Sequence, residues 1–389
     1  RDDRYAHEVL VSRPFDGLLI SKPIVDGSPG ISGHRYSTAS RQRFYREGAR
    51  QFFRLTGQNA DVLIMGDCGA FAYVNEYEPP YTVSEVADFY VHSGLDWGVA
   101  PDHIVFGFVR PGDPNPDDMV DEWERRRKIT IDNATKFLDE LTRRNTRLEP
   151  VGVAHGWNAE SYTDSVAQLQ DIGYRKIAMG GMVPLRSPDI VATLEAVAAE
   201  LETETDLHLL GVTRTNDMKT FESLGVTSFD STSPFLRSFK DETHNYFVLD
   251  DTYVALKVPQ VDGNASLKRR IKSGVVDQRA AINAERRCLR VLRDFDQDKT
   301  DTESALEAIA DYIMIADSKE IRTDDYRRTL EDQPWRHCPC GLCSEAGIDI
   351  VLFRGSERNK RRGFHNLAIF RERITRNGFP SLQPSQDYT

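Results

Sequence analysis

The stretch VLIMGD (residues 62–67) is a short apolar run that ends in a carboxylate, and the same kind of run recurs downstream. Runs of this length are typical of buried strands or of pieces of a buried helix, and periodicity alone does not separate the two. Each run ends in a polar or glycine-rich turn. The recurrences are GLDWGVAPD (residues 94–102), VGVAH (residues 151–155), IAMGG (residues 177–181), HLLGVT (residues 208–213) and VTSFD (residues 226–230).

The character of the segments between these apolar runs indicates that the runs themselves are strands. Residues 117–144, 161–172 and 187–201 carry apolar side chains three and four positions apart, with charges between them, as amphipathic helices do. Buried strands that alternate with such helices form a parallel sheet with right-handed crossovers. The six units between residues 61 and 230 favour an α/β fold of the (β/α)₈ TIM-barrel type over an open doubly wound sheet.

In such a barrel the chemistry gathers at the carboxyl ends of the strands. We therefore expect the polar residues that end the predicted strands to lie along one rim. They are Asp67, Asp102, His155, Gly180, Gly181 and Asp230.

The sequence changes character after Asp230. Residues 246–258 alternate like a hairpin, and residues 278–295 and 302–315 have the pattern of amphipathic helices. We expect two domains. These are a barrel catalytic domain over residues 1–330, with a hairpin and helical insertion around residues 239–300, and a zinc-binding subdomain with a C-terminal tail over residues 331–389.

Composition excludes several classes of protein. The chain has 389 residues with 50 Lys and Arg against 61 Asp and Glu, a net charge of −11. This charge excludes a uniformly basic nucleic-acid-binding protein, but not a local basic stripe. No apolar run approaches the roughly 18 residues that a membrane span needs, and the charged residues 1–20 lack the apolar core of a secretory signal. We expect a cytoplasmic protein without a membrane partner.

A cysteine cluster near the end of the chain predicts a metal site. Three cysteines follow the spacing C-x-C-x₂-C, and a histidine follows after 21 intervening residues. Thiolates and an imidazole suit tetrahedral Zn²⁺, and four protein ligands make such a site structural. His337 is an alternative fourth ligand, whereas Cys68 and Cys288 are expected to be ordinary buried thiols. The predicted zinc ligands are Cys338, Cys340, Cys343 and His365.

The strand-end carboxylates Asp67 and Asp230 could have either of two roles, structural or catalytic. A strand-end Asp can cap the next helix. Alternatively, two carboxylates that converge at a barrel rim can work at an acetal-like carbon, where one attacks and the other moves a proton. The residues alone do not name the substrate.

Taken in order, the motifs GDCGAF, GLDWGVAPDHI, VGVAHGW, IAMGGM, HLLGV, GVTSFDSTSPFLR and the cysteine cluster resemble the tRNA-guanine transglycosylases. The resemblance runs from about residue 61 to residue 365. These zinc-bearing (β/α)₈ enzymes exchange guanine in a nucleic acid for a 7-deazaguanine. The amino-acid sequences of these motifs are similar in particular to those of the branch that acts on DNA and inserts 7-cyano-7-deazaguanine (preQ0).

The resemblance implies a role for each matching residue. Asp230 falls on the nucleophile that attacks C1′ and forms a covalent glycosyl-enzyme, and Asp67 falls on the general acid/base. Asp102 matches the carboxylate that reads the Watson–Crick edge of the base, because the family's D-x₅-D spacing recurs from Asp96 to Asp102. The other matches are Phe71 and Leu210, which sandwich the purine, Gly180 and Gly181, which donate backbone hydrogen bonds, and Arg237, which contacts a phosphate or stabilises a loop.

Three departures from the family pattern bear on the substrate. His155 stands where the tRNA enzymes usually have Gln; it can donate to a purine oxygen or be a satisfied strand-end imidazole. The stretch GGMVPL lacks the Glu that bacterial enzymes carry after the paired glycines, which favours a neutral cyano base over an aminomethyl base. SPFLR replaces the usual L-P-T-R and keeps Arg237, which can also be a surface ion pair.

Two basic runs are candidate nucleic-acid contacts or merely solvated faces. The reacting C1′ is inaccessible in a stacked duplex, so the target nucleotide must be flipped or single-stranded. The first run is Arg354, Arg358, Lys360, Arg361 and Arg362, and the second is Lys268, Arg269, Arg270 and Lys272.

Several hypotheses stay open. We expect a guanine transglycosylase with DNA as the polymer and a free 7-deazaguanine base as co-substrate; tRNA is the alternative polymer. A zinc-stabilised nucleic-acid-binding protein without catalysis and a barrel hydrolase that leaves abasic sites are the competing classes. The resemblance also implies a homodimer, and accessory DNA-modification proteins are further expected partners.

Overall fold

A computed structural model describes residues 3–27, 36–114, 116–317, 321–379 and 381–382. The chain divides into two compact units. The sheet unit comprises the described residues within 15–231 and 375–389, and the helical unit comprises the described residues within 1–14 and 232–374. Among the described residues, none of the helices has both the length and the apolar composition to cross a membrane.

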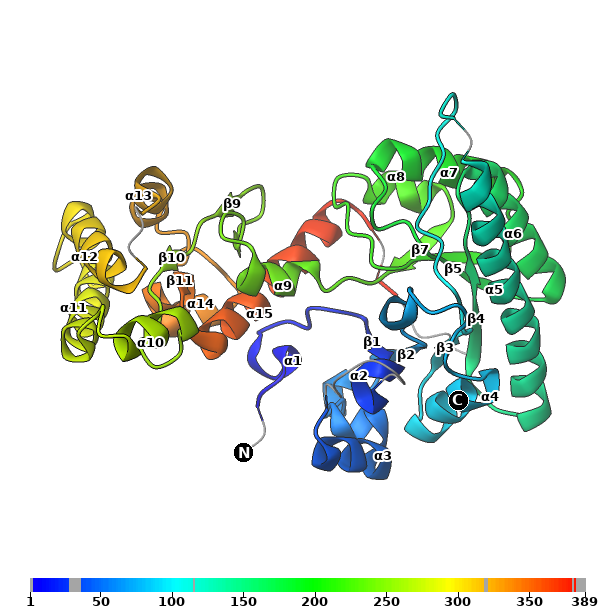
Figure 1. Ribbon diagram of the computed structural model, residues 1–389, viewed down its shortest axis with the longest axis horizontal. Helices are drawn as coiled ribbons and strands as arrows, with labels where there is room; N and C mark the ends of the chain where they lie inside the picture. Colours follow the sequence, from blue (N-terminus) through cyan, green and yellow to red (C-terminus); the bar gives the residue numbers. More distant parts are fainter. Residues whose placement is uncertain (1–2, 28–35, 115, 318–320, 380, 383–389) are drawn as a thin grey trace. The chain divides into compact units, whose positions relative to one another are not determined.

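The sheet unit contains seven described strands, all parallel and hydrogen-bonded in the order in which they occur along the chain (Figure 1). A doubly wound sheet would reverse its strand order at a switch point, whereas sequential order is that of a barrel wall. The α/β, barrel-type prediction is thus confirmed for seven of the eight expected strands. The strands are β1 (Gly17–Ser21), β2 (Leu63–Asp67), β3 (Trp97–Val99), β4 (Glu149–Ala154), β5 (Lys176–Met179), β6 (Asp206–Leu209) and β7 (Val226–Phe229).

Strand β1 was not among the sequence predictions. It pairs with β2 in register, so that Ser21 lies opposite Asp67. The run GLLI before a Lys-Pro pair is its only signal, and it lacks the strand-end carboxylate that marked the other runs. The missed strand is consequential because it places a hydroxyl beside a predicted catalytic acid.

Helices follow the strands and pack against one another in succession from α3 to α8. Local signals define them: Thr82 caps α4 through a capping box with Glu85, and Gly94 ends that helix in the left-handed region. The helices predicted over residues 117–144, 161–172 and 187–201 are confirmed as α5, α6 and α7. The elements are α2 (Lys22–Asp26), α3 (Thr38–Phe52), η1 (Gly57–Asn59), η2 (Ala70–Tyr73), α4 (Val83–Ser93), α5 (Asp117–Arg144), α6 (Ala159–Ile172), α7 (Ser187–Ala199) and α8 (Met218–Ser223).

The inner face of the curled sheet is an apolar core. Successive strands contribute to a single buried cluster, which is what closure of a sheet around its own interior requires. Burying each large apolar side chain stabilises the fold by about 1.5–3 kcal/mol. The cluster consists of Met65, Val99, Val151, Val153 and Ala178, with Leu19, Trp97 and Leu210 packed against it.

The helical unit confirms the pattern predicted for the second half of the chain. Strands β8 and β9 form the expected antiparallel hairpin, and α11 packs on α12. Strand β10 pairs in parallel with β11, nearly a hundred residues later. The elements are α1 (Ala6–Val9), α9 (Ser233–Lys240), β8 (Tyr246–Phe247), β9 (Thr252–Tyr253), β10 (Leu256–Lys257), α10 (Ala265–Lys272), α11 (Gln278–Asp296), α12 (Thr302–Ala316), α13 (Thr323–Asp332), α14 (Leu342–Ala346), η3 (Gly347–Val351), β11 (Leu352–Phe353) and α15 (Gly355–Arg376).

The two compact units divide after residues 14, 231 and 374. Residues 232–330 pack with the segment that carries the cysteine cluster, because the β10–β11 pair and the α12–β10 and α11–η3 contacts join them. The assignment of residues 1–330 as the catalytic domain and residues 331–389 as the zinc-binding subdomain stays a prediction.

Candidate functional site

Asp67 is the last residue of β2, at the carboxyl end of the sheet. Burial raises the pKa of its carboxyl group to about 7. A hydrogen bond from the backbone of Gly69 and one from Ser21 oppose this shift, whereas the negative charges of Asp102 and Asp230 add to it. A carboxyl group with a pKa near 7 can both give and accept a proton at neutral pH.

The three acids end or follow strands of the same parallel sheet, at its carboxyl end. Asp102 follows β3 and Asp230 follows β7, yet both carboxylates act on Asp67. The sequence expectation that Asp67 and Asp230 converge is consistent with this geometry. Neither acid occupies the cap position of the α-helix that follows it, because Thr82 precedes α4 and Thr232 precedes α9.

Asp230 is held by groups from the neighbouring strand and the turn after it. Its Oδ1 atom accepts a hydrogen bond from Gly211 N at 2.9 Å and lies 3.3 Å from Nε2 of His208. The Nδ1 atom of His208 lies 2.8 Å from the hydroxyl of Ser228. About a quarter of the Asp230 side chain is exposed, so the carboxylate is fixed but reachable from solvent.

Asp102 is almost fully buried, with 4% of its surface exposed. Its Oδ1 accepts a hydrogen bond from the thiol of Cys68 at 3.0 Å, and its Oδ2 lies 2.7 Å from Nε2 of His155. The hydroxyl of Tyr73 donates to its backbone carbonyl at 3.0 Å. An ionised carboxylate only accepts hydrogen bonds, so Nε2 of His155 carries the donated proton. A carboxylate has roughly four acceptor positions, which leaves capacity for a ligand.

His155 packs against the paired glycines that end the β5 run. A Cβ on Gly180 would lie 2.3 Å from the imidazole, so only glycine permits this approach. Gly181 has a φ of 76°, in the left-handed region that glycine adopts without strain. The Gly180 N–H is already bonded to the carbonyl of Ala154, so Gly181 is the better placed of the two predicted donors. The buried Nδ1 of His155 has no hydrogen-bond partner within the described residues.

Phe71 and Leu210, the predicted purine sandwich, have different environments. Phe71 is 63% exposed, an unusual exposure for a phenyl ring, and its ring centroid lies 5.5 Å from that of Phe106. Leu210 is partly buried and packs on the core inside the sheet. An exposed ring in the turn that follows Asp67 is available for stacking on a base.

The predicted metal ligands lie together in the helical unit. The sulfur atoms of Cys338, Cys340 and Cys343 lie 3.3–3.5 Å from Nδ1 of His365, and all four ligand atoms fall within 4.8 Å of one another. Tetrahedral coordination, with metal–sulfur and metal–nitrogen bonds of about 2.3 and 2.0 Å, requires sulfur–nitrogen separations of about 3.5 Å. The four residues can therefore hold a metal ion. The alternative ligand His337 is exposed and is not part of the group.

The surroundings of the cluster orient the imidazole. The Nε2 atom of His365 lies 2.8 Å from the carbonyl of Phe247, which fixes its proton there and leaves Nδ1 for a metal. Tyr246 stacks on the imidazole at 4.1 Å, and its hydroxyl lies 3.2 Å from the sulfur of Cys343. Such partners of the ligands are what a preorganised metal site needs.

Two of the five residues in the first basic run are buried, so they are neither exposed nucleic-acid contacts nor part of a solvated face. Arg362 is 0% exposed and donates to the carbonyls of Leu352 and Ser238, and burial lowers its pKa to about 9. Arg354 is also buried and pairs with Glu285 at 2.6 Å. Arg362 points inward because helical periodicity along α15 turns its side chain toward the core. The remaining members form ion pairs, which join Arg358 to Asp349, Lys360 to Asp3 and Arg361 to Glu345.

The other predicted contacts also belong to the helical unit. Arg237 lies on α9, and its guanidinium is 5.8 Å from the centroid of the Phe247 ring. On α10, Arg270 donates to the last carbonyls of α12, which gives it a structural role. The remaining members of this second run are Lys268, Arg269 and Lys272.

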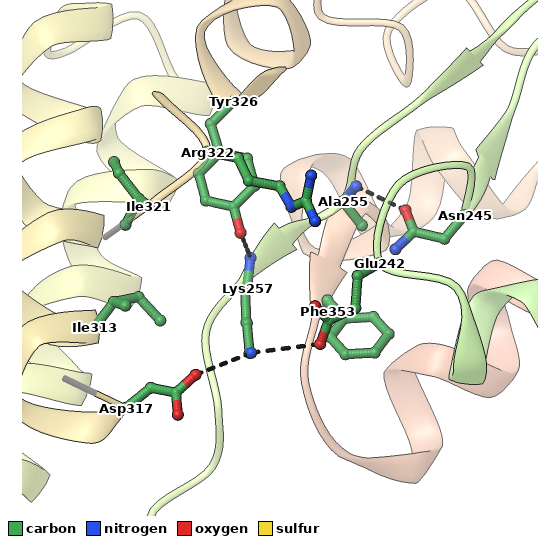
Figure 2. Close-up of a pocket in the computed structure, with 10 residues that line it drawn as sticks. All are labelled: Glu242, Asn245, Ala255, Lys257, Ile313, Asp317, Ile321, Arg322, Tyr326 and Phe353. Atoms are coloured by element: carbon green, nitrogen blue, oxygen red, sulfur yellow. Dashed lines mark hydrogen bonds and ion pairs between the residues drawn. The ribbon is translucent and has the colours of Figure 1, made fainter. Parts of the chain in front are cut away.

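A cavity of about 310 Å³ lies in the helical unit between the hairpin segment, α12 and α13 (Figure 2). Figure 2 shows Lys257 in its wall, and its ammonium group lies 3.0 Å from Asp317 and 3.4 Å from Glu242. The charge of Lys257 is therefore compensated within the protein. None of the residues predicted for catalysis or metal binding lines this cavity.

Three residues at the site escaped the sequence analysis: His208 and Ser228, which lie inside predicted strands, and Tyr73, which ends η2 after Asp67. Cys68, expected to be an ordinary buried thiol, is buried but donates a hydrogen bond to Asp102. A polar residue at an inward-facing strand position was a usable signal for His208 and Ser228. The contact of Phe106 with Phe71 had no signal in the sequence.

Comparison with known proteins adds an independent line of support. No family model matches the chain. A protein of Salmonella montevideo named DNA-guanine transglycosylase is 44% identical over 379 residues, which cover 96% of this chain and 89% of that protein. Identity at this level over nearly the whole length of both proteins extends well beyond the short motifs. The chain therefore belongs to the guanine transglycosylase family of enzymes, in its DNA-acting branch.

Proposed function

We propose that this protein exchanges guanine in DNA for 7-cyano-7-deazaguanine through a covalent glycosyl intermediate on Asp230. The observation that carries the proposal is the placement of Asp67, Asp102 and Asp230 at the carboxyl ends of three strands of one parallel sheet, where the charges of Asp102 and Asp230 help to raise the pKa of Asp67. Three neighbouring acids at that edge reduce the stability of the fold, because their mutual repulsion and their burial both oppose ionisation. A role in a reaction accounts for their presence. The name of the Salmonella montevideo relative supports DNA as the polymer.

In the first half-reaction, a carboxylate oxygen of Asp230 attacks C1′ of the target deoxyribose. The bond from C1′ to the base nitrogen breaks, and its electron pair leaves with guanine. The Gly211 N–H bond and partial exposure of Asp230 support this role, because the nucleophile is held yet open to the sugar. A carboxylate captures the oxocarbenium-like carbon without a further cofactor.

Asp67 supplies the proton that the departing guanine needs. With a pKa of about 7, a substantial fraction of its carboxyl group is protonated at neutral pH. In the second half-reaction the resulting carboxylate takes a proton from the incoming base, whose nitrogen attacks C1′ and displaces Asp230. One group thus serves as acid and then as base, so that the proton balance closes over the exchange.

Base recognition involves the buried part of the site. The Asp102 carboxylate is suited to accept hydrogen bonds from the Watson–Crick edge of guanine, and the Gly181 N–H is suited to donate to its carbonyl. Because Nε2 of His155 is engaged by Asp102, His155 contributes to the base mainly by orienting that carboxylate. Phe71 offers a stacking face, and Leu210 offers the opposing apolar wall.

The metal site is proposed to hold structural Zn²⁺ through Cys338, Cys340, Cys343 and His365. Three thiolates and an imidazole fill a tetrahedral shell, so the ion would stabilise the helical unit and take no part in the exchange. Arg237, Lys268, Arg269 and Lys272, together with Arg358, Lys360 and Arg361, are proposed phosphate contacts. A homodimer and accessory DNA-modification proteins stay predictions.

The test is an exchange assay with the full chain. Radiolabelled guanine or preQ0 is offered with plasmid DNA and, separately, with unmodified tRNA. The proposal predicts that label enters DNA and that unlabelled guanine is released in equal amount. Incorporation into tRNA alone would reverse the choice of polymer, and abasic sites without incorporation would identify a hydrolase.

A further inference from the structure

The strand pair that leads to Asp230 departs from regular geometry next to the carboxylate. Along the β6–β7 ladder Leu207 pairs with Val226, but His208 pairs with Ser228, so Thr227 is an extra residue on β7. Such bulges re-aim side chains and are over-represented beside active sites. Here the shift brings the side chains of His208 and Ser228 into direct register.

The two side chains form a hydrogen-bonded chain that ends on Asp230. Nδ1 of His208 lies 2.8 Å from the Ser228 hydroxyl, and Nε2 lies 3.3 Å from Asp230 Oδ1. Because the carboxylate only accepts, Nε2 is the donor, and Nδ1 then accepts the Ser228 O–H. Both His208 and Ser228 are buried, at 6% and 4% exposure, so solvent does not replace these partners.

The two oxygens of Asp230 are therefore not equivalent. Oδ1 accepts from Gly211 N and faces His208, whereas Oδ2 has no hydrogen-bond partner among the described residues. A hydrogen-bonded oxygen is a poorer nucleophile because the donors stabilise its charge. The two donors on Oδ1 also restrict rotation of the carboxylate, so the direction in which Oδ2 points is fixed.

We propose that His208 is a positioning residue that, with Ser228 behind it, holds Asp230 by Oδ1 so that Oδ2 attacks C1′. The inference rests on the proposed function of Asp230. In the attack the Oδ2–C1′ bond forms, the C1′–base bond breaks with its electron pair on guanine, and Asp67 protonates that base. His208 keeps its proton throughout and only fixes the geometry.

The test compares His208→Leu, His208→Gln and Ser228→Ala in the full chain. Loss of a hydrogen bond to a charged group predicts that His208→Leu lowers kcat for guanine exchange by about 10- to 100-fold. The KM values for DNA and base should change less than about twofold, since no substrate contact is removed. His208→Gln, which keeps an N–H donor, should recover most of the rate, and Ser228→Ala should cause a smaller loss.

A matched control is Thr193→Val, which removes a buried hydroxyl on α7 in the same unit and should leave kcat unchanged. The inference is overturned if His208→Leu keeps wild-type kcat, if the loss appears only as a raised KM, or if His208→Gln is no better than His208→Leu. Failure of the proposed function is distinguishable, because the wild-type protein itself would then exchange no base and form no DNA adduct.

Discussion

His155 Nε2 lies 2.7 Å from Asp102 Oδ2, and both side chains are buried at the carboxyl end of the sheet. The acid that is proposed to read guanine is thus already oriented before a base arrives. Cys68 holds the other oxygen at 3.0 Å, so the carboxylate is fixed from two sides. Preorganisation of this kind lowers the entropic cost of binding.

Asp102→Asn should impair base recognition specifically. The amide cannot accept two hydrogen bonds from the Watson–Crick edge, so we expect kcat/KM for the free base to fall by about 10- to 100-fold, equivalent to about 1.5–3 kcal/mol. The measurement is steady-state exchange with varied base concentration. Asp96→Asn is the matched control, because Asp96 lies just before the same strand and pairs with Arg50. An Asp102→Asn enzyme with unchanged kcat/KM would exclude Asp102 from base recognition.

Asp67→Asn should stabilise the protein in a pH-dependent manner. The pKa of Asp67 rises from 3.8 to about 7 on folding, so the folded state retains a proton that the unfolded state releases between these values. The free energy of unfolding therefore falls as pH rises from about 4 to 7, by up to about 1.4 kcal/mol per pH unit. Asn does not titrate, so the free energy of unfolding of the variant lacks this dependence on pH. The difference in free energy of unfolding, variant minus wild type, should therefore be more positive at pH 8 than at pH 4.

Urea unfolding of both proteins at the two pH values measures the difference. Exchange activity of Asp67→Asn should be lost at both. A stability difference that is the same at pH 4 and pH 8 would show that the carboxyl group titrates normally and is not suited to shuttle a proton at neutral pH.

Arg362 and Arg361 are neighbours with opposite expected roles. Arg362→Met removes three hydrogen bonds from a fully buried site, so we expect a loss of about 2–4 kcal/mol in the free energy of unfolding. Arg361→Met should leave stability nearly unchanged and reduce the slope of log affinity against log salt by about one if Arg361 contacts a phosphate. DNA anisotropy titrations across salt concentrations, beside urea unfolding, separate the two. The reverse pattern would contradict the assigned burial.

These neighbours illustrate what the sequence could and could not predict. Strand-end carboxylates and the cysteine spacing are local signals, so Asp67, Asp230 and the metal cluster could be placed from residue order. A basic run alone does not reveal which face of a helix each residue occupies, so the burial of Arg362 could not be predicted from it. The β6–β7 register shift that joins His208 to Ser228 is set by tertiary pairing, which no spacing rule reveals.

Cys340→Ser should release zinc and destabilise the protein by several kcal/mol, because structural zinc binding contributes directly to folding. Metal content per chain, measured by elemental analysis, and thermal unfolding test this outcome. Cys288→Ala is the control, since Cys288 is buried in the same unit outside the cluster and should leave metal content unchanged. Retention of one zinc per chain in Cys340→Ser would remove that residue from the ligand set.

Trapping of a covalent DNA adduct addresses the nucleophile itself. Wild-type protein, end-labelled DNA and no incoming base are mixed, denatured and resolved on a gel, with Asp230→Asn as the variant. The account predicts a labelled protein band for the wild type and its absence for Asp230→Asn, with free guanine released only by the wild type. An adduct of undiminished yield in Asp230→Asn would contradict it.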